Sequence, residues 1–131
     1  TDSDDIEQAL RTTLRKFEHQ SGLKAQLDIH GHGVALPSDV QLQVLHVVQE
    51  ALSNARKHAH ASEVQLDVFR GPKWVFRVRD NGRGFDPASP AADETHVGLQ
   101  IMRERAERIG AHIAIDSQPH QGTEVRIELN T

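Results

Sequence analysis

The architecture of this chain follows from "DNGRGFD", residues 80–86, which ends a run of alternating apolar and polar residues. Because side chains alternate along a strand, Asp80 shares the face of Phe76 and Val78, which must turn toward the protein interior. A carboxylate carried inward is costly unless it accepts hydrogen bonds. We therefore expect either a neighbouring donor for Asp80 or a ligand that brings one, such as an exocyclic amine.

The two glycines of this stretch, Gly82 and Gly84, permit backbone geometries and a close approach that a Cβ would block. A plain glycine-rich turn at the end of a strand explains them equally well. A calcium-binding loop fits less well, because the glycines stand where that motif needs oxygen ligands. The stretch alone therefore leaves a surface turn and a ligand site as alternatives.

Composition indicates one domain with a substantial core, since the chain has 131 residues of which 37% are apolar. The formal net charge is −4 and no basic run occurs, so nucleic acid is not an expected partner. The absence of cysteine excludes a disulfide scaffold and thiolate metal sites, and fits a cytosolic compartment. No apolar run is long enough to span a bilayer, and the start at Thr1 predicts a piece of a longer protein.

Periodicity in the rest of the chain switches between helical and strand-like patterns. Amphipathic helices are predicted over about residues 3–21, from Ser38 or Asp39 to about His60, and around Leu99–Ile109. Strands are predicted at residues 25–30, 63–69, 74–80, 112–117 and 123–129. The segment "DPASPAADETH" (86–96) has two prolines and no periodicity, which predicts a mobile loop. This order favours an α+β fold, a two-layer α/β sandwich with a mixed, mostly antiparallel sheet and helices on one face.

One helix flank carries a polar stripe, because Glu50, Asn54 and Lys57 in "QEALSNARKHAHA" (49–61) fall within an arc of roughly 60° at helical spacing. Oxygen ligands suit Mg²⁺, and a lysine serves as a point charge for phosphate. The stripe could therefore hold a hydrated divalent cation and the phosphates attached to it. An exposed helix flank with an i,i+4 contact is the simpler alternative.

Two further stretches that contain glycine add to this pattern. In "HVGLQIM" (96–102), Gly98 is expected to open a helix directly after the proline-rich loop, where free N–H groups and the helix dipole favour phosphate. A plain helix cap is the alternative there. In "QGTEVRIEL" (121–129), Thr123 has the parity of the apolar residues that follow it, so its hydroxyl is expected to face the same interior as Asp80.

Together, the helix stripe, the D-x-G-x-G stretch, the G-L at a helix start and the final G-T resemble the ATP-binding catalytic domain of bacterial sensor histidine kinases. These domains belong to the gyrase, Hsp90, histidine kinase and MutL superfamily, whose Bergerat-type ATP-binding fold is therefore expected. The resemblance covers nearly all 131 residues, with "QEALSNARKHAHA" similar to the N box and "DNGRGFD" and "HVGLQIM" similar to the two glycine boxes. The run "HVGLQIMRERAERIGAHI" with "GTEVRI" is most similar to nitrate/nitrite sensor kinases of the NarX type.

The resemblance implies a role for each matching residue. Asp80 would accept a hydrogen bond from the adenine amino group, with Gly82 and Gly84 shaping the adenine wall. Asn54 would ligate Mg²⁺ and Glu50 would orient the metal or its waters, which makes these two the expected catalytic and metal-binding residues. The remaining expected contacts to the nucleotide are Lys57, His58, Val97, Gly98, Leu99 and Thr123.

The resemblance also assigns the segment 86–96 to the ATP lid, although the F box of many sensor kinases is not evident there. In this subfamily the phosphoacceptor histidine is followed by an acidic residue, and none of the nine histidines here is. The acceptor is therefore expected outside this chain. Two histidine pairs are expected to lie on the surface rather than to bind a transition metal, namely His30 with His32 and His58 with His60.

The sequence therefore predicts a protein-histidine kinase domain of a two-component system. It would bind ATP and Mg²⁺ and pass the γ-phosphate to the dimerisation domain of the same kinase, with a response regulator as an indirect partner. The resemblance further implies nitrate or nitrite sensing and a cytoplasmic position within an inner-membrane sensor. Two alternatives stay open, a nucleotide-binding regulatory module without transfer and a protein serine kinase of the anti-sigma-factor type.

Overall fold

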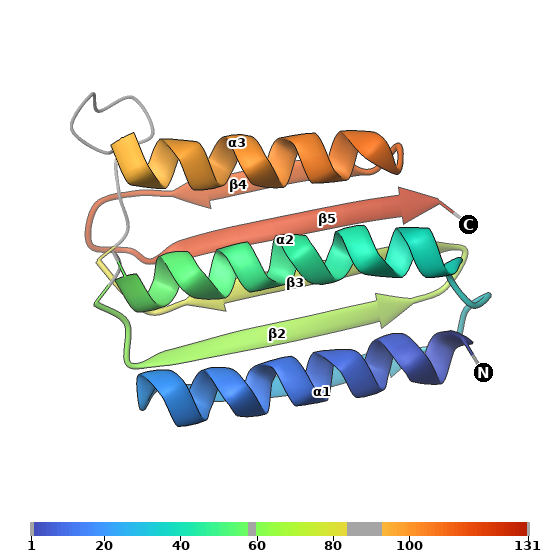
Figure 1. Cartoon of the computed structure of the whole chain (residues 1–131), viewed down its shortest axis with the longest axis horizontal. Coiled ribbons are helices and arrows are strands. Elements are labelled where there is room, and N and C mark those ends of the chain that lie inside the picture. Colours follow the sequence, from blue (N-terminus) through green and yellow to red (C-terminus); the bar gives the residue numbers. More distant parts are fainter. Residues whose placement is uncertain (1, 58–59, 84–92, 131) are drawn as a thin grey trace.

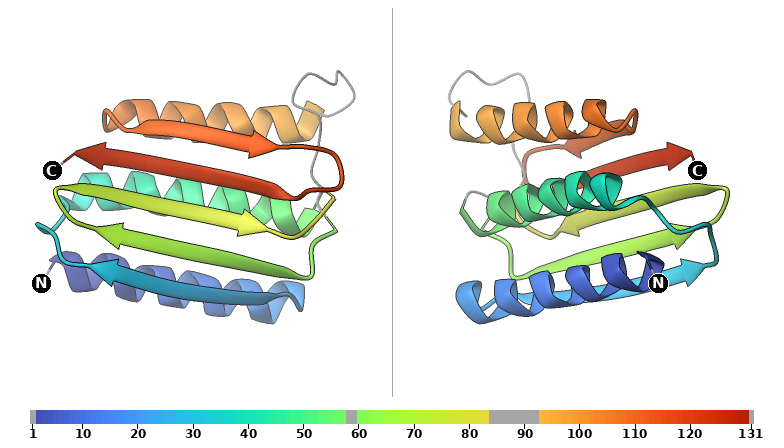
Figure 2. Two further views of the ribbon diagram at one scale, coloured as in Figure 1. Left: turned by 180° about the vertical axis from the view of Figure 1, so that it is seen from behind. Right: turned by 45° about the vertical axis from the view of Figure 1, so that its right-hand side comes forward.

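The computed structural model describes residues 2–57, 60–83 and 93–130, which form a five-stranded sheet with helices packed on one face (Figure 1). The helices are α1 (Asp2–Ser21), α2 (Ser38–Lys57) and α3 (Asp93–Arg108). The strands are β1 (Lys24–Gly31), β2 (Glu63–Arg70), β3 (Lys73–Asp80), β4 (His112–Ser117) and β5 (Thr123–Asn130). Figure 2 shows the two layers from the sheet side and from an oblique angle. Within these residues, no helix has the length and apolar character needed to cross a membrane.

The strands lie in the order β1-β2-β3-β5-β4, so β5 is inserted between β3 and its own hairpin partner β4. β1 and β2 are parallel, and the other neighbours are antiparallel. At one end of the sheet this register aligns a row of residues across four strands, namely Val64, Asp80, Thr123 and Ser117. Residues that oppose each other directly point to the same face of a sheet, so the four side chains face the helices together.

The core lies between the sheet and one apolar stripe from each helix. In α2 the stripe consists of Val44, Val47, Val48, Ala51, Leu52 and Ala55, all of them buried. Across the sheet, Trp74 and Phe76 are fully buried and stacked, with their ring centroids 5.7 Å apart. The indole N–H of Trp74 donates to the carbonyl of Val34 over 3.0 Å, which satisfies the one polar atom of this side chain. Apolar burial of this kind is the main stabilising contribution to the fold.

The opposite face of the sheet is polar and centres on Asp67, a carboxylate that is only 6% exposed. Its Oδ2 accepts hydrogen bonds from Arg77 and Arg79, over 3.1 and 3.2 Å, and its Oδ1 accepts one from Gln65. Burial alone would raise the pKa of Asp67. The hydrogen bonds from Arg77 and Gln65 and the two guanidinium charges outweigh it and hold the pKa below its ordinary value.

The predicted α+β sandwich is confirmed, including its mixed and mostly antiparallel sheet with helices on one face. One local expectation is wrong, because α3 begins at Asp93 and Gly98 therefore does not open it. The physical reason lies in the sequence before the glycine: acidic residues are favoured in the first turn of a helix, and no proline occurs between Pro90 and Gly98. Residues 93–96 of the predicted loop are thus helical, and residues 86–92 lie outside the described part of the chain.

Candidate functional site

Asp80 is the last residue of β3, and its side chain faces the helices as its strand parity predicts. Its Oδ1 accepts a hydrogen bond from the backbone N–H of Gly82 over 2.9 Å. Burial raises the pKa of Asp80 above its ordinary value, while hydrogen bonds from the backbone N–H groups of Gly82 and Thr123 act against that rise. The expected neighbouring donors are therefore present, and they fix the orientation of the carboxylate.

A small cavity opens beside this carboxylate, between the sheet and the two helices α2 and α3. Three polar side chains reach it from separate elements: Asn54 from α2, Asp80 from β3 and Thr123 from β5. The rest of its wall is apolar and consists of Ala51, Val78, Leu99, Met102 and Val125. A few convergent polar groups on apolar walls are typical of small-molecule sites.

The cavity has a volume of about 10 Å³, which is room for about one water molecule. A planar base therefore enters only if the wall moves. Leu99 and Met102 both belong to α3, and both are buried against the site. We expect α3 to be the wall that shifts, since the opposite wall is the hydrogen-bonded sheet.

Helices α2 and α3 touch at Gly98, which lies against the polar stripe predicted on α2. A Cβ on Gly98 would come within 2.7 Å of the Glu50 Oε1 and 3.1 Å of the Asn54 Oδ1. Only a glycine lets the α3 backbone come this close to the two side chains. Carboxylate and amide oxygens thus converge beside the cavity, which is the donor set that Mg²⁺ prefers.

The other predicted residues fall into three groups. Gly82 is buried next to Asp80, where it donates its N–H, as described above. Lys57 ends α2 with an exposed side chain, and Val97 on α3 is 60% exposed. His58 and Gly84 lie outside the described residues. The roles assigned to these positions stay predictions.

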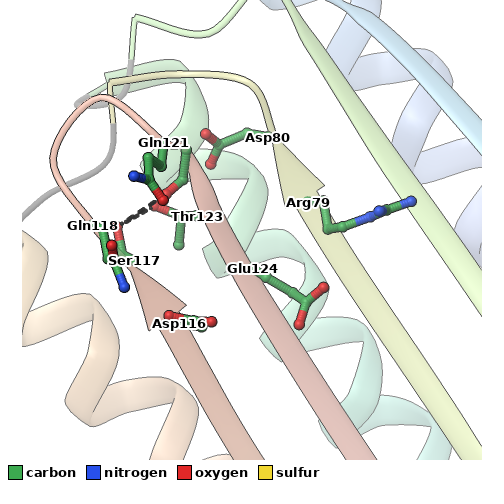
Figure 3. A pocket seen from close by; sticks show the side chains of 9 residues that line it. Arg79, Asp80, Asp116, Ser117, Gln118, Gln121, Thr123 and Glu124 are labelled. Atoms are coloured by element: carbon green, nitrogen blue, oxygen red, sulfur yellow. Dashed lines mark hydrogen bonds between the residues drawn. The ribbon is translucent and has the colours of Figure 1, made fainter.

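Ser117, which was not among the predicted site residues, continues the row of Asp80 and Thr123 onto β4. Its side chain is 6% exposed, and its Oγ lies 2.8 Å from the Thr123 Oγ1 (Figure 3). Parity could have indicated it, because Ser117 shares the face of Ile113 and Ile115. Parity could not have indicated that Ser117 lies near Asp80, since this proximity depends on which strand lies next to β3.

At this end of the sheet, the backbone of Gly122 also lies unusually close to the backbone of Asp80. Gly122 has a φ of +75°, and a Cβ there would collide with the carbonyl oxygen of Asp80. The same end of the sheet carries a second, polar pocket, lined by Asp80, Thr123 and Gln121 among others (Figure 3). Asp80 and Thr123 thus stand between this pocket and the small cavity under α3.

Comparison with known proteins identifies the family of this chain. Residues 39–131 match the family described as histidine kinase-, DNA gyrase B-, and HSP90-like ATPase. The chain belongs to this family. The matched range contains β3, α3, β5 and all of α2 after Ser38, the elements that line the cavity.

Two relatives of the chain are signalling proteins. The chain is 36% identical over 129 residues to the nitrate/nitrite sensor protein NarQ of Escherichia coli (strain K12), covering 97% of this chain and 22% of that protein. It is 32% identical over 121 residues to the signal transduction histidine-protein kinase/phosphatase DegS of Brevibacillus brevis, covering 92% of this chain and 31% of that protein. The chain thus spans between a fifth and a third of the length of these two relatives.

A solved structure agrees with these relationships. The blue-light activated histidine kinase EL346 of Erythrobacter litoralis superposes with a TM-score of 0.75 at 25% identity, over 92% of this chain and 40% of that one. The predicted resemblance to the ATP-binding catalytic domains of sensor histidine kinases is therefore confirmed, and with it the expected type of fold.

Proposed function

We propose that this domain binds ATP together with Mg²⁺ and transfers the γ-phosphate to a histidine on a separate dimerisation domain. The observation that carries the proposal is the small cavity itself. Asn54, Asp80 and Thr123 are distant in sequence and lie on three elements, yet they line one cavity between apolar walls. Family membership supplies the class of ligand, a nucleotide.

On this proposal, Asp80 recognises the adenine. Backbone N–H groups of Gly82 and Thr123 hold the carboxylate from two sides, and its remaining lone pairs are available to an exocyclic amine. Val78, Leu99 and Met102 supply apolar surfaces for the ring. A base with a carbonyl oxygen in place of the amine would instead face the carboxylate with a second acceptor, so it should bind less tightly.

Asn54 and Glu50 fit the metal that the family implies. Their oxygens converge where the α3 backbone comes closest to α2, so close to Gly98 that a Cβ there would clash with the Glu50 Oε1. Bound Mg²⁺ would neutralise charge on the phosphates during transfer. Asn54 would hold it directly, Glu50 would orient its waters, and Lys57 at the end of α2 would supply a positive charge for phosphate.

The chemical step itself belongs to the acceptor. An imidazole nitrogen of the partner domain forms a bond to the γ-phosphorus while the bond from that phosphorus to the β–γ bridging oxygen breaks, and ADP leaves. This domain contributes by positioning the γ-phosphate and by stabilising its charge. It needs no covalent intermediate of its own.

Finer parts of the proposal concern the whole protein. The NarQ relative favours nitrate or nitrite as the signal, and a response regulator as the later recipient of the phosphate fits a two-component pathway. On the same basis, the domain would work on the cytoplasmic side of an inner-membrane sensor. These parts rest on the similarity and not on the geometry of the site.

The test uses the 131-residue chain with ATP and MgCl₂, followed by addition of the dimerisation domain of the parent protein. We expect micromolar-range binding that Asp80→Asn abolishes, and acid-labile phosphate on the added domain that Asn54→Ala abolishes. Asp116→Asn is the matched control, because Asp116 is exposed on the opposite face at the same end of the sheet.

The outcomes separate the alternative functions. Unchanged ATP affinity and unchanged transfer in both variants would overturn the proposal. Binding with no phosphohistidine on the added domain would favour a regulatory module. Acid-stable phosphate on a protein partner would favour a serine kinase, because phosphohistidine is acid-labile.

A further inference from the structure

Ser117 is a buried polar residue to which the proposed mechanism assigns no role. It is 6% exposed and lies at the end of β4, directly opposite Thr123 on β5. Thr123 in turn lies directly opposite Asp80 on β3. The three side chains form a polar row at the end of a sheet face that is otherwise apolar, since the next row consists of Leu66, Val78, Val125 and Ile115.

Hydrogen bonds join the members of this row. The Oγ of Ser117 lies 2.8 Å from the Oγ1 of Thr123. The Ser117 hydroxyl also donates to the carbonyl of Gly122 over 3.3 Å. A serine hydroxyl carries one proton and accepts through its lone pairs. If that proton goes to Gly122, the bond between the two hydroxyls must use the proton of Thr123.

We propose that Ser117 is a positioning residue that holds the Thr123 hydroxyl as an acceptor toward the cavity. With its proton directed to Ser117, Thr123 presents lone pairs to the space that it shares with Asp80. The cavity then offers two acceptors, a carboxylate and a hydroxyl, to a ligand amine with two N–H donors. This inference rests on the proposed nucleotide-binding function and names a determinant of its base specificity.

The proposal predicts a change in specificity when Ser117 loses its hydroxyl. Without its partner, the Thr123 hydroxyl is free to turn, and it can then donate to a carbonyl oxygen of the base. The preference for a 6-amino purine over a 6-oxo purine should therefore fall. A role of Ser117 in packing alone would weaken both nucleotides equally.

The experiment measures the affinity of the 131-residue chain for ATP and for inosine triphosphate, in which a carbonyl oxygen replaces the amino group. In Ser117→Ala we expect ATP affinity to fall about three- to tenfold, the range for one hydrogen bond, and inosine triphosphate affinity to stay the same or rise. Ser117→Cys keeps the volume but bonds only weakly, so it should show the same change. Ser117→Thr retains a hydroxyl and should restore the preference.

Two controls make the result specific. Ser21→Ala removes a hydroxyl that donates to the Phe17 carbonyl at the end of α1, away from the cavity, and should leave the ratio of the two affinities unchanged. In a Thr123→Val background, Ser117→Ala should have no further effect on that ratio, because the group it orients is gone.

The inference is overturned if Ser117→Ala and Ser117→Cys leave the ratio at the wild-type value, or if the loss is equally large in the Thr123→Val background. Its failure is distinguishable from failure of the proposed function. A chain that binds ATP through Asp80 but does not depend on Ser117 refutes only the inference. A chain in which Asp80→Asn leaves ATP binding intact refutes both.

Discussion

Gly98 of α3 lies so close to Asn54 of α2 that a Cβ on the glycine would come within 3.1 Å of the Asn54 Oδ1. The same Cβ would come within 2.7 Å of the Glu50 Oε1. The contact between the two helices therefore requires a residue without a side chain at position 98. It also places the backbone of α3 beside the oxygens proposed to hold the metal.

Gly98→Ala should separate stability from function. The nearest atom is the flexible end of Glu50, which can rotate away, and alanine favours a helix over glycine by about 1 kcal/mol. The free energy of unfolding should therefore change by no more than about 1 kcal/mol, as measured by urea denaturation. Mg²⁺-dependent ATP affinity should fall about tenfold or more, because Glu50 and Asn54 are displaced. Gln100→Ala, at an exposed position of the same helix, is the control and should leave affinity unchanged.

Asp80→Asn should abolish ATP binding without destabilising the fold at neutral pH. The pKa of Asp80 is raised in the folded protein, so the folded state holds this proton more tightly than the unfolded state does. The stability that the group contributes is present below its ordinary pKa of 3.8 and is lost as pH rises through the raised value. At neutral pH the ionised group weakens the fold. The asparagine variant should therefore unfold at the same or a higher urea concentration, and a clearly lower midpoint would contradict this explanation.

ATP affinity of the wild-type chain should fall as pH decreases, whereas the stability contributed by Asp80 is lost as pH rises. The ionised form of Asp80 is a pure acceptor, whereas the protonated form uses one oxygen as a donor. Affinity should fall as pH decreases toward the raised pKa of Asp80. This fall should begin at a higher pH than it would for an aspartate with the ordinary pKa. Calorimetric titrations from neutral to mildly acidic pH check this, with the nucleotide's own phosphate titration corrected by a reference. A flat profile down to pH values at which Asp80 is protonated would argue against Asp80 as the adenine acceptor.

Asp67→Asn should destabilise the fold and leave nucleotide binding unchanged. The pKa of Asp67 is lowered in the folded protein, so its contribution is present above the ordinary pKa of 3.8 and is lost as pH falls through the lowered value. We expect a loss of about 1–3 kcal/mol at neutral pH, as Arg77 and Arg79 lose a charged partner. The difference from wild type should shrink at acidic pH. Asp116→Asn, at an exposed position of the same sheet face, should show neither effect.

Trp74→Phe should also affect stability alone. The substitution removes the hydrogen bond from the indole to the Val34 carbonyl and leaves a void in the core, which should cost about 1–3 kcal/mol. Trp74 lies near the start of β3, whereas Asp80 ends that strand. ATP affinity measured below the unfolding transition should therefore match that of the wild-type chain. A weaker affinity would show that the core and the site are coupled along β3.

Much of the site was predictable because it depends on local periodicity. Alternation along β3 placed the Asp80 side chain on the helix-facing side, and the same rule placed Thr123 on that side of β5. Helical spacing put Glu50 and Asn54 on one flank of α2, and both indeed approach Gly98. Side-chain direction within a strand or helix is a property of a few consecutive residues, so the sequence determines it.

Only the tertiary structure decided which of these faces meet. The last two strands pair with each other as a hairpin, and β5 rather than β4 lies next to β3. That order brings Thr123 opposite Asp80 and places Ser117 one strand further away. Strand order depends on how distant segments cover the same apolar surface, and no local pattern encodes it. The start of α3 was missed for a related reason. The helix begins at Asp93, and Gly98 serves its packing against α2, a contact between two helices that lie far apart along the chain.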